Sequence, residues 1–224
     1  MATIKRVIEA LKNYFTTGDA GDIGLLESEL YGIGLNSEVE AKLQDFVGYY
    51  PQINLEQLTQ LPEGTLGYEY AHHMHKCGIE PLEISEDLRE EADSNPFALR
   101  YIVTHDIFHI LLGFDTSYPG EMGVFAFTVG QNYTKMLNIV YPLVLLLFLI
   151  IRPTQIKKTL ANNRRGKAVG KQAESLLVYP FEENWARPIV DIRSELGLVL
   201  EDEQLDAEVG SGINRGQSQR TIAT

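Results

Sequence analysis

The stretch PFALRYIVTHDIFHILLG, residues 96–113, reads as one long helix with a clear start and a clear stop. Ser94 or Asn95 can cap its beginning, and the proline that follows loses no needed hydrogen bond at the first helical position. Gly113 suits the other end, where glycine readily adopts the left-handed conformation. We therefore predict a helix over residues 96–112.

The same stretch carries candidate metal ligands. On a helix that turns about 100° per residue, His105 and His109 lie about 40° apart, and Asp106 projects about 60° from His109. The segment Tyr118-Pro119-Gly120 favours a turn, so the reversed chain can bring Glu121 back over the two imidazoles. The spacing therefore predicts one site built from His105, Asp106, His109 and Glu121.

Two nitrogen and two oxygen ligands suit zinc, iron or manganese better than calcium, and soft ligands are too few for copper. An HxxxH pair alone is more often a pair of core or capping residues, but the neighbouring aspartate and the returning glutamate favour a metal site. Two roles are open to Asp106. It is either a direct ligand or an outer partner that accepts a hydrogen bond from a ligating imidazole.

A second histidine group, HHMH, contains His72, His73 and His75. His72 and His75 lie about one helical turn apart. No carboxylate is spaced to complete a site with them, so we expect a mixed surface and packing role rather than a second metal site.

The composition sets the class of protein. A chain of 224 residues with 44% hydrophobic content can bury one sizeable core, so we expect a single domain over residues 1–200. The net charge of −12 argues against a nucleic-acid partner. One cysteine, Cys77, cannot form an internal disulfide and is compatible with a reducing compartment.

Helical signals recur along the chain and strand alternation is scarce, so the expected fold is all-α: a single mostly helical domain with a metal-motif helix pair and an apolar, lipid-facing helix. The other expected helices follow from their caps and breakers. They are a segment opened by a Ser37/Glu40 capping box and ending near residues 50–51, a helix from Thr65 to about Gly78, a long helix from near Gly120 to about Val140 that Pro142 bends or breaks, and a last helix between Pro188 and Gly197.

An uncharged run, IVYPLVLLLFLII at residues 139–151, precedes a basic one. It is shorter than the roughly 20 residues of a membrane span. From Arg152 to Lys171 there are seven basic residues and no acidic one. One interpretation is a lipid-tail site beside cations that face phosphates or an anionic membrane; the other is a buried helix followed by a solvated amphipathic one. The first assigns the tail to Val144, Leu146, Leu147 and Phe148, and the phosphates or membrane surface to Lys157, Lys158, Arg164 and Arg165.

The two ends of the chain differ in character. The start, MATIKRVIEALKNYF, has helical apolar spacing rather than a signal-peptide core, and we expect neither a signal peptide nor a mitochondrial presequence. Beyond about Glu201 the sequence becomes acidic and then polar, so residues 201–224 are expected to be a disordered tail.

Over roughly residues 60–197 the chain resembles the fourth Coq protein family of ubiquinone (coenzyme Q) biosynthesis. The resemblance rests on LPEGTLG at 61–67, Arg100-Tyr101, HDIFHILLG at 105–113, Gly120-Glu121, the proline-interrupted apolar run, and Trp185, Pro188 and Leu196-Gly197. It implies a mostly helical homodimer at the membrane face, associated with other quinone-synthesis enzymes. It also implies one divalent metal on His105, Asp106, His109 and Glu121, with zinc the first candidate and iron, manganese and magnesium as alternatives.

The resemblance further implies oxidative decarboxylation at C1 of a polyprenyl aromatic precursor. The competing hypothesis is a non-catalytic prenyl-lipid-binding scaffold that organises the other enzymes; a closed four-ligand site would favour it, and an open position would favour the enzyme. A His-Asp phosphohydrolase, with His72 and Asp191 as further ligands, ranks last. We expect a bacterial cytoplasmic protein at the membrane periphery, without a transmembrane span.

Three positions near the motif depart from the family pattern. Members typically read RYREVHD before the metal site and GE-x-x-x-K after it, whereas this chain has RYIVTHD and GEMGVF. Charged positions are thus replaced by Ile102, Val103 and Phe125. A site that has lost three charges beside its metal is compatible with a different quinone precursor, or with lipid binding without the same turnover.

Overall fold

A computed structural model of the chain describes residues 31–49, 52–81, 86 and 89–198, and all α-helices named below lie in these ranges. Across them the regular structure is helical and no strand is formed, which confirms the all-α prediction. The tail from residue 201 lies outside the described residues, and the single domain over 1–200 stays a prediction. The helices are α3 Ser37–Leu43, α4 Leu55–Leu58, α5 Leu66–Cys77, α6 Arg89–Ser94, α7 Pro96–Leu112, α8 Tyr118–Gly130, α9 Lys135–Ile151, α10 Ile156–Gln172 and α11 Ile189–Glu195.

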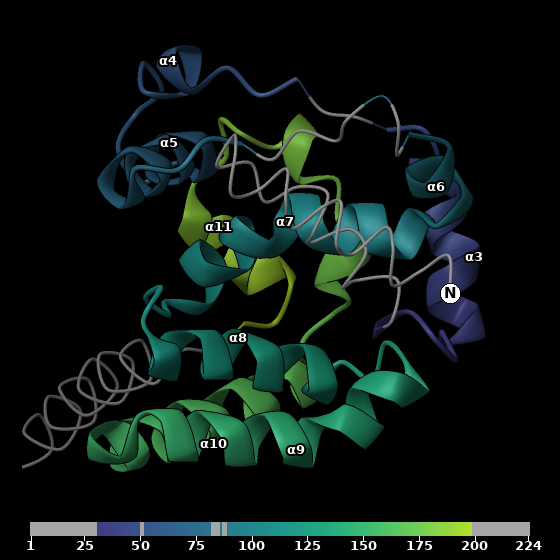
Figure 1. Cartoon of the computed structure of the whole chain (residues 1–224). Coiled ribbons are helices and arrows are strands. Elements are labelled where there is room, and N and C mark those ends of the chain that lie inside the picture. Colours follow the sequence, from purple (N-terminus) through teal and green to yellow (C-terminus); the bar gives the residue numbers. More distant parts are fainter. Residues whose placement is uncertain (1–30, 50–51, 82–85, 87–88, 199–224) are drawn as a thin grey trace, which may run out of the picture.

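The long helices α8, α9 and α10 lie together in the lower part of the fold and form its lower layer, with α7 above them (Figure 1). Helix α7 carries buried residues on all sides and is therefore the central helix of the fold. Phe108 of α7 meets Phe127 of α8 edge to face, with ring centroids 5.9 Å apart, and also contacts Phe181 at 6.4 Å. The core thus surrounds the central helix, and these aromatic rings form its part toward α8.

The predicted helix ends around the motif are confirmed. Helix α7 starts at Pro96, its cap Asn95 accepts a hydrogen bond from the backbone N–H of Ala98 at 3.1 Å, and Gly113 ends it with φ 64°. Helix α5 runs between Thr65 and Gly78, as expected. These helix ends could be predicted because a capping asparagine and a terminal glycine are each typical of one end of a helix.

The prediction for the first described helix was wrong in detail. Asn36 rather than Ser37 caps α3, because its side chain accepts a hydrogen bond from the backbone N–H of Glu38 at 2.9 Å. The helix ends at Leu43 and continues as a 3-10 turn only to Phe46, short of the expected residues 50–51.

The expected long helix from Gly120 to Val140 was also wrong. Helix α8 ends at Gly130, Asn132 takes a left-handed φ of 53°, and the Thr134 side chain caps a new helix, α9, by accepting from the backbone N–H of Leu137. Pro142 lies inside α9 without ending it. Asn138, whose carbonyl the proline cannot serve, is exposed, so water can replace the missing hydrogen bond.

Glycines allow α10 to pack directly on α8. A Cβ atom at Gly166 would overlap the backbone oxygen of Gly123, and one at Gly170 would overlap the backbone oxygen of Phe127. The two helix backbones therefore approach more closely than side chains would permit. This close packing fixes α10 beneath the start of α8, where Glu121 lies.

Helix α9 is an apolar helix with an exposed face. Leu137 is its only buried residue, while Ile139 and Leu143 are each 68% exposed. The alternative of a buried core helix is therefore wrong. Within the described ranges, no helix alone has both the length and the apolar composition to cross a bilayer; the pair Lys135–Ile151 and Pro153–Gln172, bent by 105°, passes on length and composition only.

Candidate metal centre

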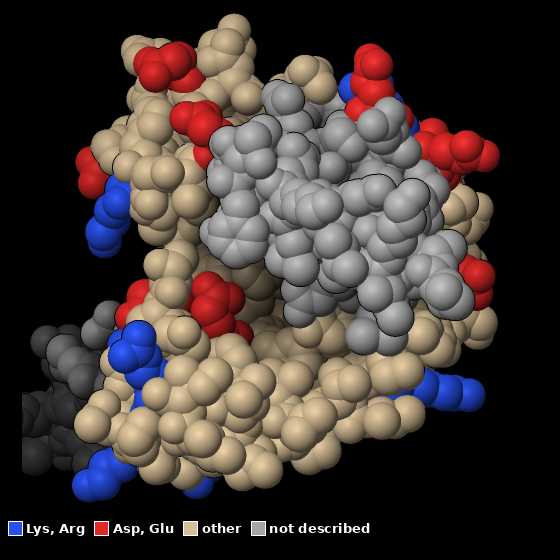
Figure 2. Space-filling model, in the orientation of Figure 1, with Lys and Arg blue, Asp and Glu red and all other residues tan. Residues whose placement is uncertain are grey.

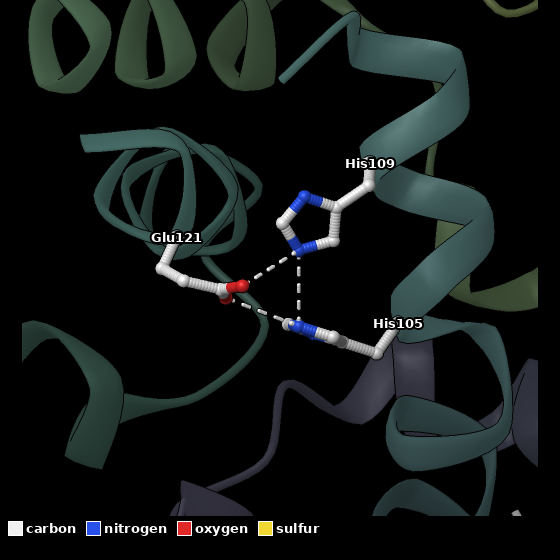
Figure 3. Close-up of side chains that lie close together, drawn as sticks. All are labelled: His105, His109 and Glu121. Atoms are coloured by element: carbon white, nitrogen blue, oxygen red, sulfur yellow. Dashed lines mark hydrogen bonds and ion pairs between the residues drawn. The ribbon is translucent and has the colours of Figure 1, made fainter. Parts of the chain in front are cut away.

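Three of the four predicted ligands converge (Figure 3). Nε2 of His105 lies 3.2 Å from Nε2 of His109, and the Glu121 carboxylate lies 3.3 Å from the first and 3.4 Å from the second. Among the described residues, these side chains form a group whose ligand atoms all lie within 4.8 Å of one another. Helix α7 supplies both imidazoles, one turn apart, and the first turn of α8 supplies the carboxylate.

The separations fit the donor set of a single cation. Atoms held at about 2.0–2.1 Å from one tetrahedral zinc lie about 3.3–3.4 Å from each other. The two imidazole nitrogens, 3.2 Å apart, are close to that value, and each has one of the two Glu121 carboxylate oxygens within 3.4 Å. A cation held by these three side chains alone would have a further coordination position for water or a substrate.

The backbone sets the tautomer of His109. Its Nδ1 lies 3.2 Å from the carbonyl oxygen of Phe114, which can only accept a hydrogen bond. The proton of the neutral ring therefore sits on Nδ1, and the lone pair of Nε2 points at His105 and Glu121. The side chain is fully buried, so this orientation is held by packing as well.

The loop between α7 and α8 turns Glu121 back toward the histidines. Asp115 accepts hydrogen bonds from the backbone N–H and the hydroxyl of Ser117, and Ser117 caps α8. A Cβ atom at Gly120 would overlap the backbone oxygen of Asp115, so only glycine permits this tight entry into the helix. Glycine is therefore required at position 120 so that the chain can turn and place Glu121 near the histidines.

Two of the predicted phosphate-binding cations contact this loop and the end of α7. Lys158 donates to Asp115 at 2.8 Å, and its bond, followed by that of Ser117, holds the Asp115 pKa below its usual value. Arg165 donates to the carbonyl oxygens of Leu112 and Gly113 at 3.0 and 3.2 Å. Both side chains therefore tie α10 to the end of the ligand-bearing helix.

The Glu121 carboxylate is ionised in this setting. Burial acts to raise its pKa, but the neighbouring imidazoles of His105 and His109 outweigh burial and lower the pKa to about 2. Its place in the first turn of α8 adds the favourable field of a helix N-terminus. The cluster therefore presents a negative charge beside two imidazoles, as a cation site requires.

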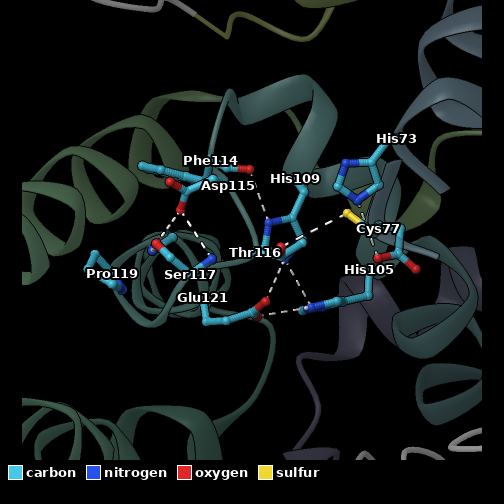
Figure 4. A network of polar contacts seen from close by, with 12 residues as sticks. His73, Cys77, His105, His109, Phe114, Asp115, Thr116, Ser117, Pro119 and Glu121 are labelled. Carbon is cyan, nitrogen blue, oxygen red and sulfur yellow. Dashed lines mark hydrogen bonds and ion pairs between the residues drawn. The ribbon is translucent and has the colours of Figure 1, made fainter. Parts of the chain in front are cut away.

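Asp106, the fourth predicted ligand, does not join the group. Its Oδ1 lies 3.8 Å from Nε2 of His73 in α5. The His73 ring is nearly parallel to that of His109, with centroids 6.1 Å apart, and Figure 4 shows both rings. In this arrangement Asp106 faces α5, and His105, His109 and Glu121 face one another.

His73 is the residue near the site that sequence reasoning missed. Of its neighbours, His72 packs on the Tyr68 ring with centroids 4.2 Å apart, and the exposed His75 lies 4.0 Å from Glu56. The available signal was position: His73 lies three residues after Tyr70, which is buried in the core.

The predicted lipid-contacting residues lie on or near the outer face of α9. Leu146 and Leu147 are half exposed, and Val144 and Phe148 are partly buried. The Phe148 ring contacts Tyr118 at the start of α8, with centroids 5.7 Å apart. These residues form part of a surface rather than an enclosed slot.

The three departures from the family pattern are apolar contacts in the structure. Phe125 lies one turn after Glu121 on α8, and its ring neighbours those of Tyr31 and Tyr141, at 6.0 and 6.4 Å. Ile102 is buried, and Val103 packs against a small cluster with Ala92, Ala98 and Leu99. The wall next to Glu121 is therefore aromatic where the family pattern has a charge.

Comparison with known proteins extends this picture. The family described as coenzyme Q (ubiquinone) biosynthesis protein Coq4 matches residues 50–202. Curated COQ4 proteins or homologues are similar: one from Aedes aegypti is 26% identical over 152 residues, one from Mus musculus 29% over 150, and one from Talaromyces marneffei 30% over 149, each over 65% of this chain. The chain spans about half the length of these relatives, with 53%, 54% and 50% covered.

A crystal structure from Nostoc punctiforme, described as a candidate ubiquinone biosynthesis protein, shares the fold. It superposes with a TM-score of 0.58 at 22% identity and covers 88% of this chain and 97% of its own. Because the family match includes α5, α7 and α8 with their histidines and glutamate, this chain belongs to the Coq4 family of coenzyme Q biosynthesis proteins.

Proposed function

We propose that this chain acts in ubiquinone-type quinone biosynthesis by binding a polyprenylated aromatic acid at a divalent metal and replacing its C1 carboxyl with a hydroxyl. The observation that carries the proposal is the convergence of His105, His109 and Glu121 on one point, at separations that suit a single cation. Membership of the Coq4 family supports the pathway.

The chain's own residues prepare the site for an anionic ring. The carbonyl of Phe114 accepts a hydrogen bond from Nδ1 of His109, and the tight turn at Gly120 places the charged Glu121 carboxylate beside the imidazoles. His105 and Glu121 are each about one third exposed, so a substrate can approach them, whereas His109 is buried. A bound divalent cation would supply Lewis-acid stabilisation of the negative charge that develops as the carbon–carbon bond breaks.

The reaction is balanced by dioxygen and a two-electron donor. The carboxyl leaves as carbon dioxide, one oxygen atom of dioxygen becomes the ring hydroxyl, and the other leaves as water with two protons and two electrons. The aromatic side chain of Phe125, one turn from Glu121, supports an apolar ring environment at this position.

The outer surface of α9 and α10 is proposed to meet the lipid phase. Between Glu121 and Glu174 the chain has no acidic residue, in spite of its net charge of −12. The charged side chains exposed there are all basic, Lys157 and Arg164 of α10 among them, and α9 exposes Ile139, Leu143, Leu146, Leu147 and Ile150. In Figure 2 the edge formed by these helices is tan with Lys and Arg near its ends, whereas acidic side chains are prominent on the upper part.

An anionic bilayer fits this surface better than a second copy of the chain does. Apolar area flanked by cations is attracted both to acyl chains and to anionic headgroups. A two-fold contact through the same face would place its cations near those of the partner. The polyprenyl tail would reach the protein from the same side. The homodimer, the association with other quinone-synthesis proteins and the bacterial cytoplasmic location stay predictions.

The test is a product measurement. Protein purified without oxygen and loaded with one equivalent of iron, manganese or zinc is incubated with a prenylated hydroxybenzoate in vesicles, air and a reductant. Mass spectrometry should show loss of the carboxyl and gain of a hydroxyl, and Glu121→Gln should abolish it. Substrate that binds but leaves unchanged with every metal would favour the scaffold role.

A further inference from the structure

A buried polar contact connects α5 to the ligand-bearing helix α7. Nε2 of His73 is buried, and no hydrogen-bond partner for it lies within reach in the described part of the chain. Its nearest carboxylate oxygen is Oδ1 of Asp106, at 3.8 Å. The two side chains are only 16% and 18% exposed, so water does little to solvate them.

A polar pair in such a place needs a compensating interaction. The distance of 3.8 Å is longer than a direct hydrogen bond. A small side-chain rotation would bring Nε2–H into contact with Oδ1. Leaving the buried Nε2 of His73 unpaired would cost folding free energy.

A second residue of α5, Tyr70, also interacts with the charge of Asp106. Burial raises the pKa of the Tyr70 hydroxyl, and the negative charge of Asp106 raises it further. Tyr70 and His73 are three residues apart and therefore share one face of α5. The Asp106 charge is thus felt by two side chains of α5, of which His73 is the one in contact range.

The His73–Asp106 contact lies next to both proposed ligands of α7, His105 and His109. Asp106 follows His105 directly in the chain, and the His73 ring lies parallel to the His109 ring, 18° between planes and 6.1 Å between centroids. Movement of His73 would therefore disturb the packing of one imidazole and the neighbour of the other.

We propose that His73 is a positioning residue for the metal centre, which pairs with Asp106 and so fixes the turn of α7 that carries His105 and His109. The inference rests on the proposed metal site. It assigns Asp106 to the outer pair rather than to the cation.

The experiment is a cobalt(II) titration of the full chain, because cobalt affinity and its visible d–d spectrum are separate readouts. His73→Phe keeps a ring and removes Nε2, whereas His73→Gln keeps an Nε2 donor. We expect about tenfold weaker cobalt binding in His73→Phe and in Asp106→Asn, within the range typical of outer partners, and near wild-type affinity in His73→Gln. The His73→Phe/Asp106→Asn double variant should also be about tenfold weaker, not about a hundredfold, since the two changes remove one interaction.

The spectrum separates positioning from ligation. Cobalt bound to Asp106→Asn should keep the wild-type bands, because its ligands are unchanged, whereas Glu121→Gln should alter them. His75→Phe, a matched change on the exposed side of α5, should bind cobalt like wild type. If His73→Phe does not fold, the His73→Gln affinity and the Asp106→Asn spectrum still decide.

Several outcomes would overturn the proposal. Equal affinity in wild type and His73→Phe would show that the contact is only structural, and loss of cobalt from Asp106→Asn as complete as from His109→Ala would make Asp106 a direct ligand. A double variant that binds cobalt about a hundredfold more weakly than wild type would show that His73 and Asp106 act independently and would contradict the proposed pairing. A wild type that binds no cobalt would refute the metal centre itself, which distinguishes that failure from failure of this inference.

Discussion

The metal-ligand cluster and the outer face of α9 lie in neighbouring parts of one helical fold but are held in opposite ways. In the cluster, nearly every polar atom has a defined neighbour: Phe114 holds His109, and both imidazoles hold Glu121. On α9, Ile139 and Leu143 extend outward with 68% of each side chain exposed. One region is organised in advance for a small charged ligand, and the other has the composition of a surface that needs a partner.

The largest effect should come from the most buried ligand. His109→Ala should lower bound divalent metal well below one per chain, because the only buried imidazole of the cluster and its fixed lone pair are lost. Metal content after dialysis, measured by mass spectrometry, checks this. His75→Ala is the control and should retain wild-type metal; equal content in both variants would refute the site assignment.

A smaller effect is expected on the apolar face. Leu146→Asp should weaken binding to anionic vesicles by about 2 kcal/mol, the value of burying one leucine, while the free energy of unfolding changes little because the side chain is half exposed. Vesicle sedimentation and urea denaturation measure the two quantities. Val190→Asp, at an exposed position of α11, is the control and should change neither vesicle binding nor the free energy of unfolding. An unfolded Leu146→Asp variant would show that α9 is core.

Adjacent arginines on α10 should separate the two regions. Arg165→Ala leaves the carbonyls of Leu112 and Gly113 without their donor, so unfolding free energy should fall by about 1.5 kcal/mol and metal binding should weaken. Exposed Arg164→Ala should leave both unchanged and lower only vesicle binding. Denaturation and cobalt titration of the two variants provide the comparison, and identical behaviour would remove the distinction between loop-holding and surface cations.

The smallest effect belongs to a single surface charge. Lys157→Ala should weaken association with anionic vesicles by about 1 kcal/mol at low salt and by less at high salt, because exposed charges are screened. Binding measured across a salt series tests this, with neutral vesicles as the control. A salt-independent loss would mean that Lys157 acts through packing.

The site was largely predictable because its geometry is local. The i, i+4 spacing of His105 and His109 and the turn before Glu121 place ligands through helix geometry and one reverse turn. The caps at Asn95 and Gly113 have the same local character. What spacing could not reveal was which way Asp106 turns, since that depends on α5, a helix some 30 residues away in the chain.

The lower layer was harder to predict because it depends on packing. Pro142 suggested a break, but exposure of Asn138 lets α9 continue, and the left-handed turn at Asn132 separates α8 from α9 instead. The sequence predicted that the basic residues between 152 and 171 form one surface, but Lys158 and Arg165 bond to the loop between α7 and α8 and to the end of α7. Sequence shows which residues are cations, and only the fold shows which of them are already paired.

The central claim is that His105, His109 and Glu121 hold one cation with a position left open. X-ray absorption spectroscopy of protein loaded with one equivalent of zinc tests it most directly. We predict two imidazole nitrogens and a protein carboxylate at about 2.0–2.1 Å, with solvent completing the shell, and a single imidazole in His109→Ala. Zinc that does not remain bound after dialysis, or that shows fewer than two imidazoles in the wild-type protein, would contradict the claim.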